Sequence, residues 1–213
     1  MPRVLILGIG NLLWADEGFG VRAVEALNRD YEFPPDVRLM DGGTQGLYLI
    51  EHVTSTDIVV VFDAVDYGLA PGSLKLVEDD DVPKFLGAKK MSLHQTGFQE
   101  VLATAELLGK LPSHLFLIGV QPVELEDYGG SLRPEVKEQI PAAIEHALAY
   151  LARLGIEGTR RSQPLSETAT IACEHMVMSR YEAERPSEDE ACRIGDARFI
   201  EMPSPQAKEK AAS

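Results

Sequence analysis

The chain has 213 residues, of which 34 are acidic and 20 are basic, so its formal net charge is −14. This acidic excess argues against a general nucleic-acid binder, which needs basic side chains to neutralise phosphates. It also argues against docking on an anionic membrane surface. Hydrophobic residues make up 45% of the chain, which is enough for a sizeable core.

Neither the cysteines nor the start of the chain points to a secreted or membrane protein. The two cysteines, Cys173 and Cys192, are too few for a disulfide framework and have no CxxC partner. The apolar stretch at the start is too short for a signal peptide, and no apolar run reaches membrane-spanning length. We therefore expect a cytoplasmic protein without membrane or nucleic-acid partners.

Up to about residue 155, apolar β-branched runs alternate with segments of helical period. Strands are predicted at Val4–Leu7, Val37–Met40, Ile58–Phe62, Ser73–Val77 and Leu115–Val120. The run at Ser73–Val77 is weaker and is expected at an edge. Helices are predicted at Glu17–Arg29 with Asp16 as N-cap, at Leu47–Val53, at Gly97–Leu108 with Thr96 as cap, and at Pro134–Leu154.

This alternation predicts an α/β fold. We expect a three-layer sandwich, with a twisted, mostly parallel five-stranded sheet and helices on both faces. The composition changes after residue 157, where Ser, Thr, Pro, Glu and Ala dominate. Residues 1–157 are therefore predicted to form one domain, and residues 158–213 a largely disordered C-terminal extension in which Ile171–Met178 has the pattern of one short helix.

Polar residues with metal-binding potential follow the predicted strands. Ligands in such folds bind at the carboxyl ends of the strands, so Glu17, Asp41, Asp63 and His94 are expected at one edge. Two carboxylates and one imidazole, from Glu17, Asp63 and His94, suit a borderline divalent ion such as zinc or nickel and leave positions open. Each residue also has an ordinary structural explanation: a helix-dipole contact, a loop cap and a solvent-edge histidine.

A dinucleotide site is the weaker interpretation of the same edge. Gly8-Ile9-Gly10, followed later by Asp41, is similar to a Rossmann fingerprint, but Leu13 occupies the place of the third glycine. Two carboxylates at the start of the next helix would repel a pyrophosphate.

The segment from Gly8 to Gly20, GIGNLLWADEGFG, closely resembles the opening signature of the nickel–iron hydrogenase maturation endopeptidases. The resemblance runs from about residue 3 to residue 154 and includes four more segments in the same order. These are Asp41-Gly42-Gly43-Thr44, Val61-Phe62-Asp63-Ala64, Ser92-Leu93-His94-Gln95 and Gly119-Val120-Gln121-Pro122. It implies a cytoplasmic protease with a twisted sheet between helices, and it leaves the extension after residue 157 unexplained.

The resemblance also implies the reaction. Members of this family remove a C-terminal extension from the hydrogenase large-subunit precursor once nickel has been inserted. The metal-binding role carries over to Glu17, Asp63 and His94, and that of the acidic loop residue to Asp41. We expect the nickel to be carried by the substrate, and zinc or cadmium to fit the same ligands.

Residue types narrow the chemistry further. The chain has no Gly-x-Ser-x-Gly motif and no cysteine in the matching region, which disfavours a serine or cysteine nucleophile. We expect an aspartic-type endopeptidase that acts as a monomer, with Asp41, Asp63 and Glu17 as the catalytic set. The attacking water would be polarised by the metal or activated by a carboxylate such as Asp41. The segments Asp66–Gly68 and Glu124–Gly129 are expected to form the substrate rim.

Two other functions stay open at this point. A non-catalytic nickel chaperone or docking module would bind the precursor without cleaving it. A dinucleotide-binding enzyme is the less favoured alternative.

Overall fold

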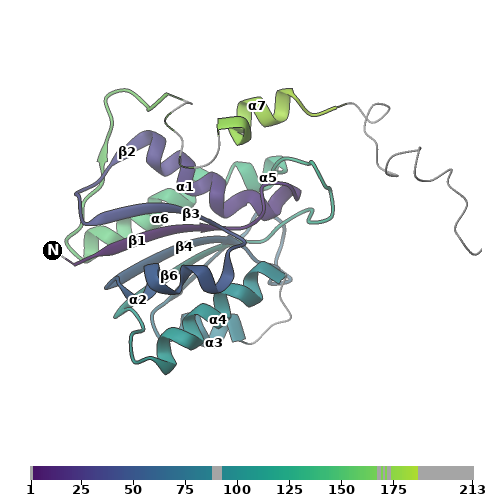
Figure 1. Ribbon diagram of the computed structural model, residues 1–213. Coiled ribbons are helices and arrows are strands. Elements are labelled where there is room, and N and C mark those ends of the chain that lie inside the picture. Colours follow the sequence, from purple (N-terminus) through teal and green to yellow (C-terminus); the bar gives the residue numbers. More distant parts are fainter. Residues whose placement is uncertain (1, 88–92, 167–168, 170, 172–173, 187–213) are drawn as a thin grey trace, which may run out of the picture. The chain divides into compact units, whose positions relative to one another are not determined.

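A computed structural model of the chain describes residues 2–87, 93–166, 169, 171 and 174–186 (Figure 1). The chain divides into two units, residues 1–183 and residues 184–213. All the helices and strands that are described lie in the first unit. Among the described residues, no helix combines the length and the apolar character needed to cross a membrane.

Five strands form the central sheet, in the order β3-β1-β4-β6-β5. They are β1 (Val4–Ile9), β3 (Val37–Gly43), β4 (Ile58–Ala64), β5 (Leu74–Glu78) and β6 (His114–Val120). The first four in the sheet order are parallel, and β5 pairs antiparallel with β6 at one edge. The predicted mostly parallel five-stranded sheet is confirmed, including the edge position of β5.

Helices cover both faces of the sheet (Figure 1). One face carries α1 (Phe19–Asp30), α5 (Pro134–Lys137) and α6 (Ile140–Arg153), and the other carries α2 (Ile50–Thr54), α3 (Asp81–Gly87) and α4 (Leu93–Leu107). Alternate residues of each strand enter the two cores. On β4, Val60 and Phe62 pack on the α1 side, whereas Val59 and Val61 pack on the α4 side. The expected three layers are confirmed.

Helix α1 lies unusually close to the sheet because glycines meet at the contact. A Cβ on Gly20 would lie 2.2 Å from the carbonyl oxygens of both Ile9 and Phe62, and a Cβ on Gly8 would lie 2.3 Å from the Gly20 carbonyl oxygen. No larger residue fits either place without moving the helix. This contact fixes the start of α1 against the carboxyl ends of β1 and β4.

Several helix boundaries differ from the predictions. The long helix predicted from Pro134 to Leu154 is broken between α5 and α6, because Pro141 has no N–H to donate to the Lys137 carbonyl and its ring clashes there. Helix α4 begins at Leu93, so Thr96 lies inside the helix and is not its cap. Helix α3 lies in a segment for which the sequence predicts no helix.

Helix α4 contains a glycine, Gly97, at a point where another segment of backbone comes very close. A Cβ at Gly97 would lie 3.1 Å from the Cα of Gly46, which begins the 3-10 helix η2 (Gly46–Leu49). The two backbones therefore approach closely where the loop after β3 meets the first turns of α4.

Part of the predicted extension packs on the body of the protein. Strand β7 (Thr159–Arg160) pairs antiparallel with β2 (Tyr31–Glu32), and η4 (Glu174–Met176) is followed by α7 (Met178–Ala183). Met178 packs against the α1-side core. The first unit thus continues to Ala183, beyond the boundary predicted at residue 157, while most of the segment expected to be disordered lies outside the described residues.

The contact of Gly20 with the sheet predicts that an alanine substitution in a helix will destabilise the protein, which is the reverse of the usual effect. Replacing glycine by alanine inside a helix normally stabilises a protein by about 0.5–1 kcal/mol. For Gly20→Ala we expect a loss of about 1–3 kcal/mol, because the added methyl group overpacks against two backbone carbonyls. Urea unfolding of the variant and the wild type measures the difference, and equal or higher stability of the variant would contradict the close approach of α1.

Candidate active site at the carboxyl edge of the sheet

The carboxyl ends of the four parallel strands lie at one edge of the sheet. Asp41 on β3, Gly8 on β1 and Phe62 on β4 are level with one another, and Asp63 is level with Gly119 on β6. The loops that leave these ends carry the residues expected to function. The candidate site is therefore built by register, since the strands bring together segments far apart in the sequence.

Asp63 is more buried than Glu17 and Asp41, with only 2% of its surface exposed. It ends the apolar run of β4 and shares the face of Val59 and Val61, which is the side covered by α2, α3 and α4. The hydroxyl of Tyr67 reaches the same region, because a Cβ on the neighbouring Gly119 would lie 2.1 Å from that oxygen. Glycine at position 119 thus leaves the space that Tyr67 fills.

The Tyr67 hydroxyl lies within the electrostatic influence of Asp63. Burial, together with the negative charge of Asp63, raises the pKa of the Tyr67 hydroxyl well above its ordinary value. The phenol therefore keeps its proton at neutral pH and is a hydrogen-bond donor. Its ring also contacts Phe85 of α3, at 4.9 Å between ring centroids, which fixes the side chain.

Glu17 is returned to the end of β1 by a tight loop. It lies in the 3-10 helix η1 (Ala15–Gly18), and its carbonyl accepts the Asn11 N–H at 3.2 Å. Gly10 allows this return: its φ is +138°, and a Cβ there would lie 1.8 Å from the Glu17 carbonyl oxygen. The side chain is half-buried, and burial raises the pKa of Glu17.

The glycines of this loop bear on the dinucleotide alternative. Gly8 is packed against Gly20, and Gly10 against the backbone of Glu17. Both glycines are thus required by contacts within the protein, and the resemblance to a pyrophosphate-binding loop loses its main support.

Asp41 projects from the opposite face of the sheet to Asp63. On β3 it shares its face with Val37 and Leu39, which pack against the α1-side core. Its Oδ1 accepts the Gly43 N–H at 2.8 Å. Burial raises the pKa of Asp41, while this hydrogen bond and the positive charge of Arg22 on α1 offset part of the rise.

His94 is placed by its backbone alone. It lies in the first turn of α4, three residues before Gly97, whose contact with Gly46 brings this end of the helix to the loop after β3. Its side chain lies outside the description. Among the described residues no three His, Cys, Asp or Glu side chains form a group able to hold a metal ion, so Glu17, Asp63 and His94 stay a predicted ligand set.

Asp16 has a role that local sequence rules missed. It was expected to cap the helix, but α1 has no side-chain cap at its start. Asp16 is fully buried, and its carboxylate accepts three backbone N–H groups: those of Val123 and Glu124 at 2.8 and 2.9 Å, and that of Arg133 at 2.6 Å. It therefore ties η1 to the loop between β6 and α5.

Gln121 performs a similar task on the loop after β4. Its side-chain oxygen accepts the N–H groups of Tyr67 and Leu69 at 2.7 and 3.1 Å, and its side-chain nitrogen donates to Asp66 at 2.9 Å. The partners lie more than 50 residues away in sequence, so no local pattern could have revealed either Gln121 or Asp16 as an organiser of the edge.

Exposed apolar side chains gather on the loops around this edge. They lie on the segments that follow β1, β3, β4 and β6, and they are Leu13, Leu47, Tyr48, Leu69, Val123 and Tyr128. The predicted rim segments, Asp66–Gly68 and Glu124–Gly129, belong to two of these same loops. A mixed apolar and acidic rim suits the binding of a polypeptide.

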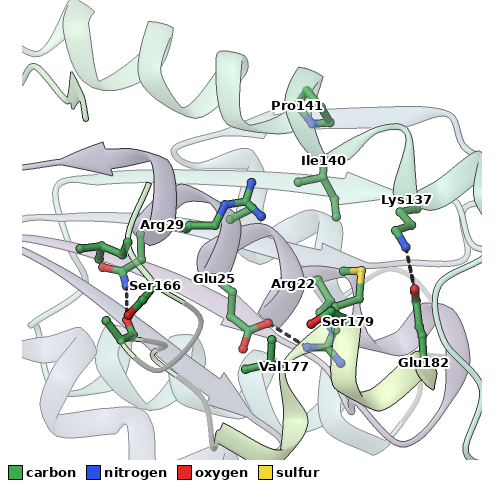
Figure 2. A pocket seen from close by; sticks show the side chains of 15 residues that line it. Arg22, Glu25, Arg29, Lys137, Ile140, Pro141, Ser166, Val177, Ser179 and Glu182 are labelled. Carbon is green, nitrogen blue, oxygen red and sulfur yellow. Dashed lines mark hydrogen bonds and ion pairs between the residues drawn. The ribbon is translucent and has the colours of Figure 1, made fainter. Parts of the chain in front are cut away.

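A separate cavity of about 460 Å³ lies between α1, the start of α6 and residues 165–182 (Figure 2). Its lining includes three cationic side chains, each held by an acidic neighbour: Arg22 by Glu25, Arg29 by Asp30 and Lys137 by Glu182. Among the described residues that line this cavity, Glu17, Asp41 and Asp63 are absent. Its charges are balanced internally, so it does not extend the candidate site.

Comparison with known proteins identifies the family. The model of the hydrogenase maturation protease (HycI) family matches residues 21–150. The hydrogenase expression/formation protein HupD of Thiocapsa roseopersicina is 61% identical over 199 residues, which is 93% of this chain and 90% of the relative. The hydrogenase 2 maturation protease of Escherichia coli is 41% identical over 160 residues, which is 75% of this chain and 96% of the relative.

Solved structures agree with these matches. The hydrogenase-maturating endopeptidase HybD from E. coli superposes with a TM-score of 0.72 at 39% identity, covering 75% of this chain and 98% of that one. The [NiFe] hydrogenase maturation protease HybD from Thermococcus kodakarensis has a TM-score of 0.56 at 27% identity, covering 70% and 98%. The chain therefore belongs to the hydrogenase maturation protease family and is a peptidase.

Proposed function

We propose that this protein is an endopeptidase that removes the C-terminal extension of the nickel–iron hydrogenase large-subunit precursor after nickel insertion. Family membership supports a protease of hydrogenase maturation. The observation that carries the proposal is the placement of the buried Asp63 and the half-buried Glu17 at the same sheet edge, within a rim suited to a polypeptide.

The nickel ion belongs to the substrate in this proposal. Glu17, Asp63 and His94 engage it with two carboxylates and an imidazole, a donor set suited to nickel, zinc and cadmium. Burial raises the pKa of Glu17, and an approaching divalent cation would favour its ionised form. A precursor without metal would leave these acidic groups uncompensated, so the site would bind the loaded precursor better.

Asp41 is the proposed general base. A water molecule loses a proton to the Asp41 carboxylate while its oxygen bonds to the scissile carbonyl carbon, and the proton then passes to the departing amine as the C–N bond breaks. Burial raises the pKa of Asp41 and makes it a stronger base than an exposed aspartate. Since Asp41 and Asp63 project from opposite faces, the peptide must lie across the strand ends.

The ligand assignment is tested by removing one donor at a time. Asp63→Asn and His94→Ala should each lower cleavage of a nickel-loaded precursor by more than about 100-fold, as expected when transition-state positioning is lost. Mass spectrometry of the precursor gives the rate. The control is Asp36→Asn, an exposed aspartate just before β3. Full activity in either donor variant would contradict the assignment, and an intact precursor with the wild type would indicate a docking module.

The proposed role of Asp41 as a base is tested by a variant that should lose cleavage but keep precursor binding. Asp41→Asn keeps Oδ1 as the acceptor for the Gly43 N–H but cannot take a proton. We expect cleavage to fall by about 10²–10⁴-fold while the precursor still binds, as measured by co-purification and single-turnover cleavage. Normal cleavage by this variant would reduce Asp41 to a loop residue.

The raised pKa of Asp41 also makes stability depend on pH. Between its unfolded pKa of about 3.9 and its higher folded pKa, the folded state binds the proton more tightly, so stability falls as pH rises through this interval. Asp41→Asn escapes this loss. The melting temperature of the variant should exceed that of the wild type at pH 7, and the difference between the two melting temperatures should be smaller at pH 4. A lower value for the variant at pH 7 would mean that attraction to Arg22 outweighs burial.

A further inference from the structure

The loop between β6 and α5 forms one wall of the candidate site and is bonded to η1. The Asp16 carboxylate accepts three hydrogen bonds from backbone N–H groups of this loop. In addition, the Asp16 N–H donates to the Glu124 carbonyl at 3.1 Å, and the Gly129 N–H donates to the Leu13 carbonyl at 2.7 Å. A shift of this loop would therefore be transmitted to η1, which carries Glu17.

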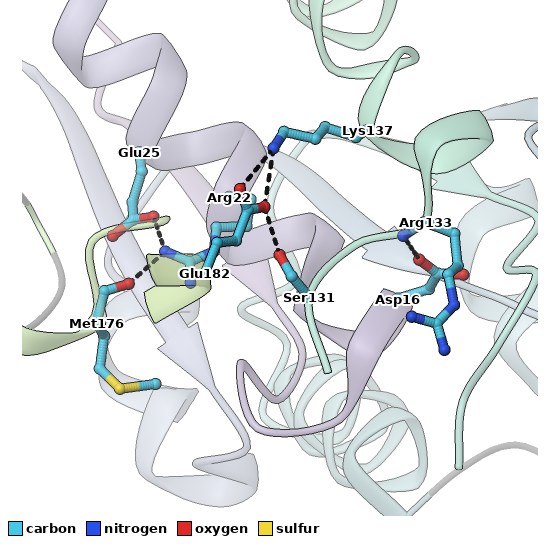
Figure 3. A network of polar contacts seen from close by, with 8 residues as sticks. All are labelled: Asp16, Arg22, Glu25, Ser131, Arg133, Lys137, Met176 and Glu182. Carbon is cyan, nitrogen blue, oxygen red and sulfur yellow. Dashed lines mark hydrogen bonds and ion pairs between the residues drawn. The ribbon is translucent and has the colours of Figure 1, made fainter. Parts of the chain in front are cut away.

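The same loop is held from its other side by α7. The Ser131 hydroxyl donates to Oε1 of Glu182 at 2.7 Å, and the Lys137 ammonium donates to both carboxylate oxygens at 2.8 and 3.1 Å (Figure 3). Ser131 lies two residues before Arg133, whose amide contacts Asp16. Two acidic side chains, one in η1 and one in α7, thus hold the loop at neighbouring positions.

The segment that carries Glu182 is itself anchored to α1. Arg22 is only 3% exposed, and its guanidinium donates to Glu25 at 3.0 Å and to the Met176 carbonyl (Figure 3). The guanidinium also lies over the Tyr181 ring, at 5.8 Å from its centroid. With Met178 in the core, residues 174–183 form a fixed support for the loop.

We propose that the segment Glu174–Ala183 is a brace, and that Glu182 is a positioning residue for cleavage. It acts through Ser131 on the β6–α5 loop and, through Asp16, on Glu17. The inference rests on the proposed protease function, because positioning of Glu17 matters to the reaction only there. About a third of the Glu182 side chain is exposed and more of Lys137, so the ion pair adds little stability. Its main effect is on geometry.

The chain contains its own reporter of the loop position. Trp14 is the sole tryptophan, and it precedes η1. It forms an isolated β-bridge with Tyr128 of the loop, and the two rings meet edge to face at 5.3 Å between centroids. Movement of the loop away from η1 would separate these rings and open Trp14 to solvent.

The test uses the full chain and three variants. Glu182→Ala should lower kcat for the nickel-loaded precursor by about 10-fold with little change in KM, and should increase acrylamide quenching of Trp14 fluorescence. Glu182→Gln keeps an acceptor for Ser131 and should restore most of the quenching protection. Glu145→Ala, an exposed glutamate on α6, is the matched control and should leave both measurements unchanged.

Coupling between the two partners gives the sharpest result. Ser131→Ala should reproduce the Glu182→Ala effects, and the double variant should be no worse than either single one. Unchanged kcat and unchanged Trp14 quenching in Glu182→Ala would overturn the brace, even if the melting temperature fell. Because Trp14 quenching needs no cleavage, it tests the brace separately from the proposed function, which an intact precursor in the wild-type reaction would contradict.

Discussion

The candidate site depends on one buried carboxylate. Asp16 is completely removed from solvent, and it is held there by three backbone amides that come from a loop more than 100 residues later in the chain. An acidic group in such a place is tolerated only because its oxygens accept these hydrogen bonds. The amides, in turn, would be buried without partners if the carboxylate were lost. The buried carboxylate therefore needs the amides, and the amides need the carboxylate. Because Glu17 directly follows Asp16 in the chain, this contact also holds Glu17 in place.

The strands could be predicted from the sequence because their signal is local. A run such as Ile58–Phe62 is short, apolar throughout and rich in β-branched residues, which is typical of a strand buried on both faces. Its end at Asp63 then located one carboxylate of the candidate site. The break between α5 and α6 could also have been found from Pro141, since the loss of the bond to Lys137 is a local effect.

Other features depend on partners far away in sequence. Asp16 matches the pattern of a helix cap, and only the folded chain shows that its partners are Val123, Glu124 and Arg133. Likewise, the placement of Asp41 and Asp63 at one edge followed from the strand ends. That they project from opposite faces depends on the register between β3, β1 and β4, which the sequence does not specify.

The C-terminal segment makes the compact unit longer than the sequence predicted. Its composition suggested a solvated tail after residue 157, yet residues up to Ala183 belong to the compact unit. The reason is that a few contacts suffice: a short β-pair, the Met178 side chain and the buried Arg22. The match with HupD covers 199 residues, which is 93% of this chain, so it includes most of the residues after 157.

The opposite orientations of Asp41 and Asp63 have a consequence for selectivity. On the proposed function, a peptide that reaches both carboxylates must bend over the ends of β1 and β4 with its own backbone free of other partners. A chain terminus can adopt that path at little cost, whereas a segment inside a folded domain must first unfold locally. On that function, the shape of the edge would favour a flexible chain terminus over a segment inside a folded domain, in addition to the preference for a nickel-loaded precursor.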